Sequence, residues 1–194
     1  LSCSDDNTMI LWDLESGKAI HHFKGHTRMV NHCAVVNENR VLSCSDDNTM
    51  ILWDLESGKA IHHFKGHTRM VNHCAVVNEN RVLSCSDDNT MILWDLESGK
   101  GIHHFEGHKH MVNHCVLNGH DEIISSSADG SIRMWDLNTG MELISAYHLK
   151  DNGYAMIKDN VLTDFSDNAW EHISFEGVDE DGRKKIFFFD EVME

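Results

Sequence analysis

The sequence contains no proline and no long apolar run, and it has half as many cationic as anionic residues. Without about 18 or more consecutive apolar residues, no segment is predicted to span a membrane. The 16 Lys and Arg are outnumbered by 32 Asp and Glu, which gives a net charge of −16. Such a chain is not expected to bind nucleic acid, because that requires a basic surface. An acidic surface fits basic protein or peptide partners better.

A repeat of 41 residues dominates what is present. Residues 1–41 and 42–82 are identical, residues 83–123 keep the first half of the unit, and a fourth, more divergent copy starts at Ile124. A fixed period of about 40–45 residues with Gly-His and Trp-Asp in each unit is typical of propeller blades. Because most residues occur in several copies, a unique catalytic site is not expected, and we predict that the protein is not an enzyme.

Each unit contains four short β-prone runs separated by short turns. In one copy these runs cover residues 29–36, 40–45, 49–55 and 59–64. Connections of this length force antiparallel hairpins, and Gly58 occupies a tight turn that requires a positive φ. No segment shows a helical apolar period over 11 residues or more. The sequence therefore predicts an all-β fold of four-stranded antiparallel meanders.

Three short motifs recur in register along the chain. Trp-Asp closes the third run, Gly-His precedes the first, and a Ser-x-Asp-x-Thr/Ser turn follows the second, as at residues 45–49 and 127–131. The dipeptides are Trp12-Asp13, Trp53-Asp54, Trp94-Asp95, Trp135-Asp136, Gly25-His26, Gly66-His67 and Gly107-His108. With these motifs, residues 1–147 resemble the WD-repeat β-propeller family.

The resemblance implies one propeller domain with about 4.5–5 blades. Residues 1–147 are expected to form WD-repeat blades, the first without its innermost strand, and residues 148–194 a degenerate terminal blade. That last segment has Trp170-Glu171 in place of Trp-Asp and no Gly-His, but its apolar residues 187–189 argue against a disordered acidic tail. Most propellers of the family have more blades. We therefore favour a truncated longer protein over an open arc that self-associates through exposed blade edges.

In the family, a His, a Ser or Thr, an Asp and a Trp form a buried hydrogen-bond chain within each blade, since these groups can donate and accept in sequence. The matching residues are His26, Ser43, Asp47 and Trp53; His67, Ser84, Asp88 and Trp94; His108, Ser125, Asp129 and Trp135; and, without a His, Ser2, Asp6 and Trp12. A hydrolase triad is rejected for three reasons. The set recurs in every blade, the Ser hydroxyl is already hydrogen-bonded to the Trp indole, and the sequence provides no evident oxyanion hole.

The six cysteines and 16 histidines raise two further hypotheses. Adjacent pairs such as His32-Cys33 point to opposite faces of a strand and cannot chelate one ion together, so no metal or other cofactor is predicted. Cys33 is predicted to lie nearly opposite Cys44, which would permit a disulfide. The family is mostly intracellular, so the resemblance implies a cytoplasmic location, and we favour free, buried thiols.

The residues expected to contact a partner come from the family's top face. They are Asp5, Met29, Asn31, Asp46, Met70, Asn72, Asp87, Met111 and Asn113, with Ala128 at the fourth Asp position. Met, Asn and Asp suit a peptide with a basic and an apolar group, although these residues are equally compatible with solvated loops.

The function implied is a non-catalytic scaffold that binds a protein or peptide on the propeller top face. The alternative is the C-terminal regulatory or sensor propeller of a larger bacterial signalling enzyme, such as a kinase, protease or NTPase. A standalone propeller enzyme or metal-dependent lectin is disfavoured, because identical repeats leave few unique polar residues.

Overall fold

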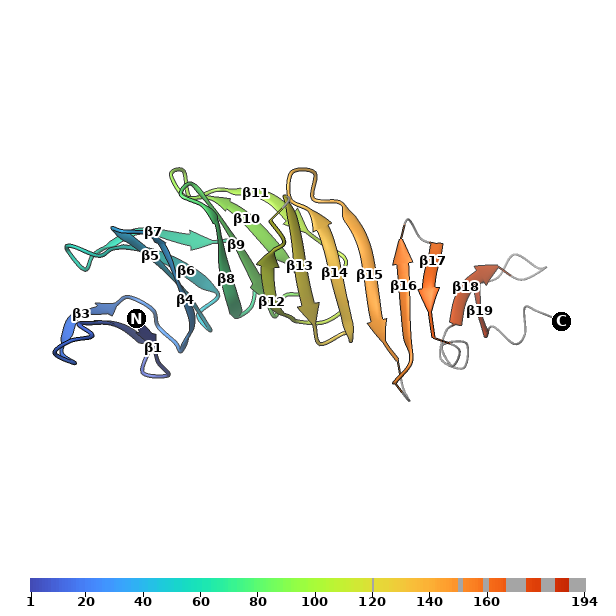
Figure 1. Ribbon diagram of the computed structural model, residues 1–194, viewed down its shortest axis with the longest axis horizontal. Coiled ribbons are helices and arrows are strands. Elements are labelled where there is room, and N and C mark those ends of the chain that lie inside the picture. The colour runs from blue at the N-terminus through green and yellow to red at the C-terminus, as the bar shows by residue number, and fades with distance from the viewer. Residues whose placement is uncertain (120, 150–151, 159–160, 167–173, 179–183, 189–194) are drawn as a thin grey trace.

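Antiparallel sheets follow one another along the chain in an open arc. The computed structural model describes residues 1–119, 121–149, 152–158, 161–166, 174–178 and 184–188. In Figure 1 the N-terminal sheet lies at one end of the arc and the C-terminal strands at the other. Within the described residues the sheets do not close into a ring. The predicted all-β class, with four-stranded antiparallel sheets and an incomplete ring, is confirmed.

Four sheets carry the repeats. The first contains β1 (Ser2–Cys3), β2 (Thr8–Trp12) and β3 (Ala19–Lys24). The second contains β4 (Val30–Asn37), β5 (Arg40–Ser45), β6 (Thr49–Asp54) and β7 (Ala60–Lys65). The third contains β8 (Val71–Asn78), β9 (Arg81–Ser86), β10 (Met91–Asp95) and β11 (Gly101–Phe105). The fourth begins with β12 (Val112–Leu117), β13 (Glu122–Ser127), β14 (Ser131–Asp136) and β15 (Glu142–His148).

The fourth sheet continues beyond one repeat. Two further strands pair onto β15, namely β16 (Tyr154–Lys158) and β17 (Val161–Phe165), and make it six-stranded. A separate two-stranded sheet pairs β18 (Ser174–Val178) with β19 (Lys184–Phe188). Part of the terminal blade predicted over residues 148–194, including Trp170 and Glu171, lies outside the described residues, and that blade stays a prediction.

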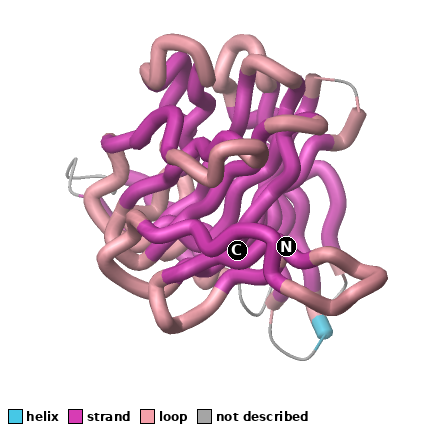
Figure 2. The backbone as a smooth tube through the Cα atoms, turned by 90° about the vertical axis from the view of Figure 1, so that its left-hand side faces the viewer, coloured by secondary structure: helices cyan, strands magenta, loops and turns pink. Residues whose placement is uncertain are grey.

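The strand pattern follows from the turns. Asn48 adopts a φ of 71° and Gly58 a φ of 68°, so the predicted left-handed conformation of Gly58 is confirmed. Asp47 fixes the turn between β5 and β6, because its Oδ1 accepts hydrogen bonds from Thr49 N at 3.0 Å and from Thr49 Oγ1 at 2.6 Å. Asp and Asn stabilise such turns through side-chain bonds to nearby backbone groups. In the absence of proline, these residues set the hairpin geometry. Figure 2 shows the resulting alternation of strands and loops.

The core lies between neighbouring sheets. Trp53 is 2% exposed and packs edge-on against Phe23 of the preceding sheet, with ring centroids 5.4 Å apart. The same contact recurs for Trp94 with Phe64 and for Trp135 with Phe105. These rings bury large apolar areas and stabilise the contact between blades.

The glycine of each Gly-His is required by this packing. A Cβ at Gly25 would lie 2.9 Å from Trp53 Cη2, and a Cβ at Gly66 would lie 2.7 Å from Trp94 Cη2. Any side chain there would displace the indole, so the motif preserves the close approach of backbone and ring.

Among the described residues, no helix has the length and apolar character needed to cross a membrane.

Candidate functional site

A continuous chain of side-chain hydrogen bonds links the top of the second blade to its core. Trp53 Nε1 donates to Ser43 Oγ at 2.8 Å, Ser43 Oγ lies 2.8 Å from His26 Nε2, and His26 Nδ1 lies 2.8 Å from Asp47 Oδ2. Ser43 is completely buried and His26 is 8% exposed. The structure therefore brings together the four residues predicted for this blade.

The third and fourth blades repeat the arrangement within about a tenth of an ångström. The corresponding residues are His67, Ser84, Asp88 and Trp94, and then His108, Ser125, Asp129 and Trp135. In the first sheet, Trp12 Nε1 still donates to Ser2 Oγ at 2.9 Å. Trp12 is 39% exposed, however, and Asp6 is exposed and bonds to Thr8 rather than to a histidine. This first set is a surface version of the buried one.

The pKa shifts of His26 and Asp47 agree with the order of donors and acceptors in this hydrogen-bond chain. Burial lowers the pKa of His26 below its ordinary value, against the opposing effect of Asp47. A neutral imidazole can donate from Nδ1 to Asp47 and accept at Nε2 from the Ser43 hydroxyl. Burial acts to raise the pKa of Asp47, but hydrogen bonds from Thr49, the Thr27 amide and His26 outweigh it and hold this pKa below its ordinary range.

The same geometry leaves the serine unsuited to nucleophilic attack. Ser43 Oγ already contacts Trp53 and His26 and has no exposed surface. A catalytic serine must reach a substrate carbonyl beside oxyanion donors. The set is therefore positioned to hold the blade together.

The predicted top-face residues divide into two groups. Asn31 Nδ2 donates to Asp46 Oδ1 at 2.7 Å and to the Val71 carbonyl of the next blade at 3.0 Å. Asn72 makes the equivalent bonds to Asp87 and Val112. These amides thus connect adjacent blades. Met70, at 37% exposed, and the exposed Asp5 and Asn113 lie at the surface, whereas Met29 and Met111 are half-buried.

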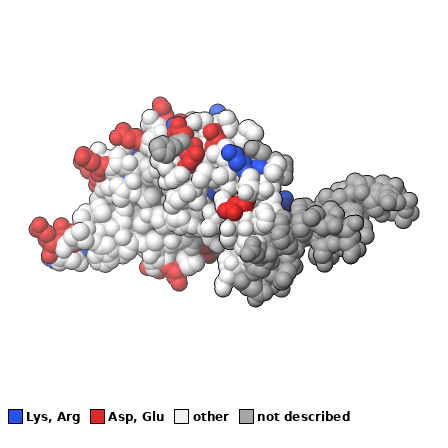
Figure 3. Space-filling view, turned by 45° about the vertical axis from the view of Figure 1, so that its right-hand side comes forward, with Lys and Arg blue, Asp and Glu red and all other residues white. Residues whose placement is uncertain are grey.

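Two grooves lie beside these residues. One, of about 330 Å³, crosses from the second to the third blade and is lined by Arg28, Asn48, Thr68, Arg69, Met70 and Asp87. A smaller one, of about 210 Å³, is lined by Thr27, Arg28, Asp46, Asp47 and Asn48. Acidic side chains are spread over much of the face seen in Figure 3. The larger groove combines both charge signs with an exposed methionine.

The cysteines are free, and four of them, Cys44, Cys74, Cys85 and Cys115, are buried. The predicted cross-strand neighbours Cys33 and Cys44 are not opposite each other. A β-bulge between Val35 and Asn37 shifts the register, so that Cys33 faces Ser43 and His32 faces Cys44. One extra residue in a strand shifts every pair that follows it. The prediction that Cys33 lies nearly opposite Cys44 was therefore wrong.

Sulfur and imidazole meet between blades instead. Cys74 Sγ lies 3.5 Å from His32 Nδ1. A hydrogen bond from Cys44 and a further one from His32 lower the pKa of Cys74 to about 6 despite its burial. Adjacent residues of one strand do not reveal this grouping, because Cys44 and Cys74 lie 12 and 42 positions after His32.

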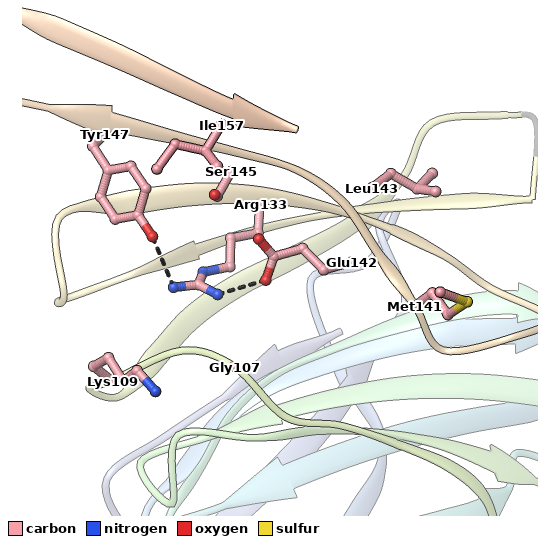
Figure 4. A pocket seen from close by; sticks show the side chains of 9 residues that line it. All are labelled: Gly107, Lys109, Arg133, Met141, Glu142, Leu143, Ser145, Tyr147 and Ile157. Carbon is pink, nitrogen blue, oxygen red and sulfur yellow. Dashed lines mark hydrogen bonds and ion pairs between the residues drawn. The ribbon is translucent and has the colours of Figure 1, made fainter. Parts of the chain in front are cut away.

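The sequence reasoning also missed a polar pocket on the fourth sheet. Arg133, 7% exposed, donates from Nη1 to Glu142 Oε2 at 2.6 Å and from Nη2 to Tyr147 Oη at 3.1 Å (Figure 4). The pocket, of about 500 Å³, is also lined by Lys109 and Ile157. The available signal was the replacement of Ile51 and Ile92 by Arg133 at the same repeat position.

The sheets, their Trp-Ser-His-Asp chains and their Gly-Trp contacts define blades of a β-propeller. The model of the family described as "WD domain, G-beta repeat" matches residues 17–54, 58–95 and 99–136, more than half of the chain. The chain belongs to this WD40 family. Each match begins before the outer strand of one sheet and ends with the third strand of the next, so each repeat ties two blades together.

A solved structure supports the same assignment. The chain is similar to the WD40 β-propeller domain of Doa1, with 28% identity and a TM-score of 0.67 over 85% of this chain. It spans 59% of the length of that chain. The comparison with curated proteins gives no match. WD40 propellers generally serve as protein-interaction scaffolds and are generally not catalytic.

Proposed function

We propose that the protein is a non-catalytic scaffold that binds a protein or peptide on the top face, in the groove between the second and third blades. The observation that carries this proposal is the groove itself, where Met70 and Asp87, both expected partner-binding residues, lie beside Arg28 and Arg69. Each of these side chains belongs to a loop at the same end of the blades, the end occupied by the Gly-His and Ser-x-Asp turns.

The lining indicates a peptide with a basic side chain next to an apolar one. Asp87 Oδ1 accepts one bond from Asn72, and a carboxylate can accept about four hydrogen bonds. It can therefore also bind a Lys or Arg of the ligand. Met70 offers a flexible apolar contact, and the two arginines can bind backbone carbonyls or an acidic neighbour on the same peptide.

A peptide panel tests the proposal. Peptides that contain Lys or Arg beside Leu, Met or Phe would be compared with peptides in which either position is Ala, using fluorescence anisotropy. Met70→Ala combined with Asp87→Asn should weaken binding at least tenfold, while Ile61→Ala should not. Ile61 is a matched control, because it is 50% exposed but lies on the outer strand β7. Equal binding by both variants would exclude the groove.

The N-terminal sheet exposes apolar side chains that could contact a second copy of the chain. Trp12 is 39% exposed and Leu14 is 96% exposed, whereas Trp53 and Trp94 are covered by a preceding sheet. As the alternative to a longer protein whose further blade would cover this sheet, we propose that copies of the chain associate through it, as exposed apolar faces favour. Sedimentation of wild type and Trp12→Ser tests this, with a lower average mass expected for the variant.

The free thiols favour a reducing compartment, and we place the protein in the cytoplasm. A thiol titration of the protein isolated without reductant, carried out in denaturant with a metal chelator, should give six reduced cysteines per chain.

A further inference from the structure

We propose that the chain contains two equivalent zinc sites between its blades. Each would use two cysteine thiolates and one imidazole as ligands. The two sets are His32, Cys44 and Cys74, and His73, Cys85 and Cys115.

Strand register brings each set together from three strands of two sheets. His32 on β4 pairs directly with Cys44 on β5, and directly paired residues point to the same face of a sheet. Cys74 lies on β8, the first strand of the next blade, which packs against β4. His73 pairs with Cys85 in the same way, and Cys115 comes from β12. The ions would therefore bridge the second blade to the third and the third to the fourth.

The spacing matches tetrahedral zinc. Within each set, all ligand atoms lie within 4.8 Å of one another. His32 Nδ1 is 3.5 Å from Cys74 Sγ, and His73 Nδ1 is 3.9 Å from Cys115 Sγ. Bonds of about 2.3 Å to sulfur and about 2.0–2.1 Å to nitrogen at tetrahedral angles place S and N about 3.5 Å apart. The ion can therefore enter with small side-chain movements.

Charge and burial favour this cation class. Cys44 is fully buried and Cys74 is 1% exposed. Two thiolates and a neutral imidazole bring a total charge of −2, which Zn²⁺ neutralises, so no net charge remains in the interior. Thiolate and imidazole ligands select zinc over calcium or magnesium. Three protein ligands leave a fourth position for water, and the half-buried His32 marks the side open to solvent.

The first and last blades of the repeat supply internal contrasts. Cys3 and Cys33 contact each other as the other cysteine pairs do, but within the described residues no histidine joins them. His114 stacks on His73 with ring centroids 3.7 Å apart, yet it has Ser126 rather than a cysteine at the adjacent strand position. The proposal therefore predicts two ions per chain, not three.

Cobalt titration tests the proposal directly. The full chain, purified with a metal-free phosphine reductant, would be titrated with Co²⁺ and then with Zn²⁺. We expect a thiolate-to-cobalt charge-transfer band that saturates at two equivalents and is displaced by zinc. His32→Asn should reduce the stoichiometry to one, and His32→Asn with His73→Asn should abolish the band.

Control variants separate ligation from folding. Cys33→Ala and His114→Asn remove a thiol and an imidazole next to the sites, and both should retain two ions. The histidine variants keep all six cysteines, so a far-UV CD spectrum equal to that of the wild type shows that they still fold. No band, a band that persists in the double histidine variant, or binding of Cu(I) without binding of Co²⁺ or Zn²⁺ would overturn the assignment.

Discussion

Ser84 and Ser2 accept the same indole hydrogen bond in two environments. Trp94 donates to Ser84 at 2.8 Å, and both residues are buried. Trp12 donates to Ser2 at 2.9 Å at the exposed N-terminal sheet. We expect Ser84→Ala to destabilise the protein strongly and Ser2→Ala to have little effect.

The magnitude follows from the groups left without partners. Ser84→Ala removes the acceptor of Trp94 Nε1 and the neighbour of His67 Nε2, which lies 2.7 Å away. An unpaired buried polar group costs about 1–3 kcal/mol, so two such groups should lower the free energy of unfolding by about 2–6 kcal/mol. Water can replace the hydroxyl of Ser2, and a surface change of this kind costs less than about 0.5 kcal/mol.

Urea denaturation followed by tryptophan fluorescence and far-UV CD measures both values. Ser43→Ala is an independent repeat, because its blade has the same hydrogen bonds, and its loss should agree with that of Ser84→Ala within about 1 kcal/mol. The m value should stay constant if only stability has changed. Equal losses for Ser84→Ala and Ser2→Ala would refute a buried, stabilising hydrogen-bond chain.

Three further predictions concern the same framework. Burial lowers the pKa of His26 and of His108 below the ordinary value of a histidine. Because the unfolded chain then binds more protons below about pH 6.5, stability should fall as pH decreases from 7 towards 5; a urea midpoint that rises on acidification would contradict this. Arg133→Ala should cost about 1–3 kcal/mol in urea unfolding, because it removes a buried side chain together with its hydrogen bonds to Glu142 and Tyr147. Arg133→Ile with Glu142→Ala, the residues of the second blade, should cost less. Gly66→Ala should cost about 1–3 kcal/mol through overlap with Trp94, and a thermal melt equal to that of Ile61→Ala would argue against the close contact.

The repeat was sufficient to predict the strands and the residues of the hydrogen-bond chain. Residues 40–45 form β5 as expected, and residues 49–55 contain β6 (Thr49–Asp54). The period sets the strand boundaries, and the placement of Gly58 and Asp47 sets the turns. The chemistry of donor-only indole and acceptor-only carboxylate then orders the side chains.

Register and contacts between blades could not be derived in the same way. The hairpin contains a bulge beside Val36 that the repeat pattern does not specify. Because of this bulge, Cys44 pairs with His32 and not with Cys33. The Cys-His groups also depend on how closely β4 and β8 approach, which no local pattern specifies. For the same reason Asn31 was expected to contact a partner, although its amide bonds to Val71 of the next blade. Contacts repeated across blades are visible only once adjacent blades are placed.

The buried core and hydrogen-bond chains hold the fold, whereas the top-face methionines are proposed to bind the partner. One comparison of variants tests this division most directly. Met29→Ala, Met70→Ala and Met111→Ala combined would be compared with Ile20→Ala, Ile61→Ala and Ile102→Ala, which remove exposed apolar side chains at one repeated outer-strand position. Each variant would be assayed for capture of the peptide selected by the wild type and for its urea midpoint. We predict that the methionine variant keeps its fold and loses the peptide, while the isoleucine variant keeps both. Peptide capture retained by a folded methionine variant would contradict the account.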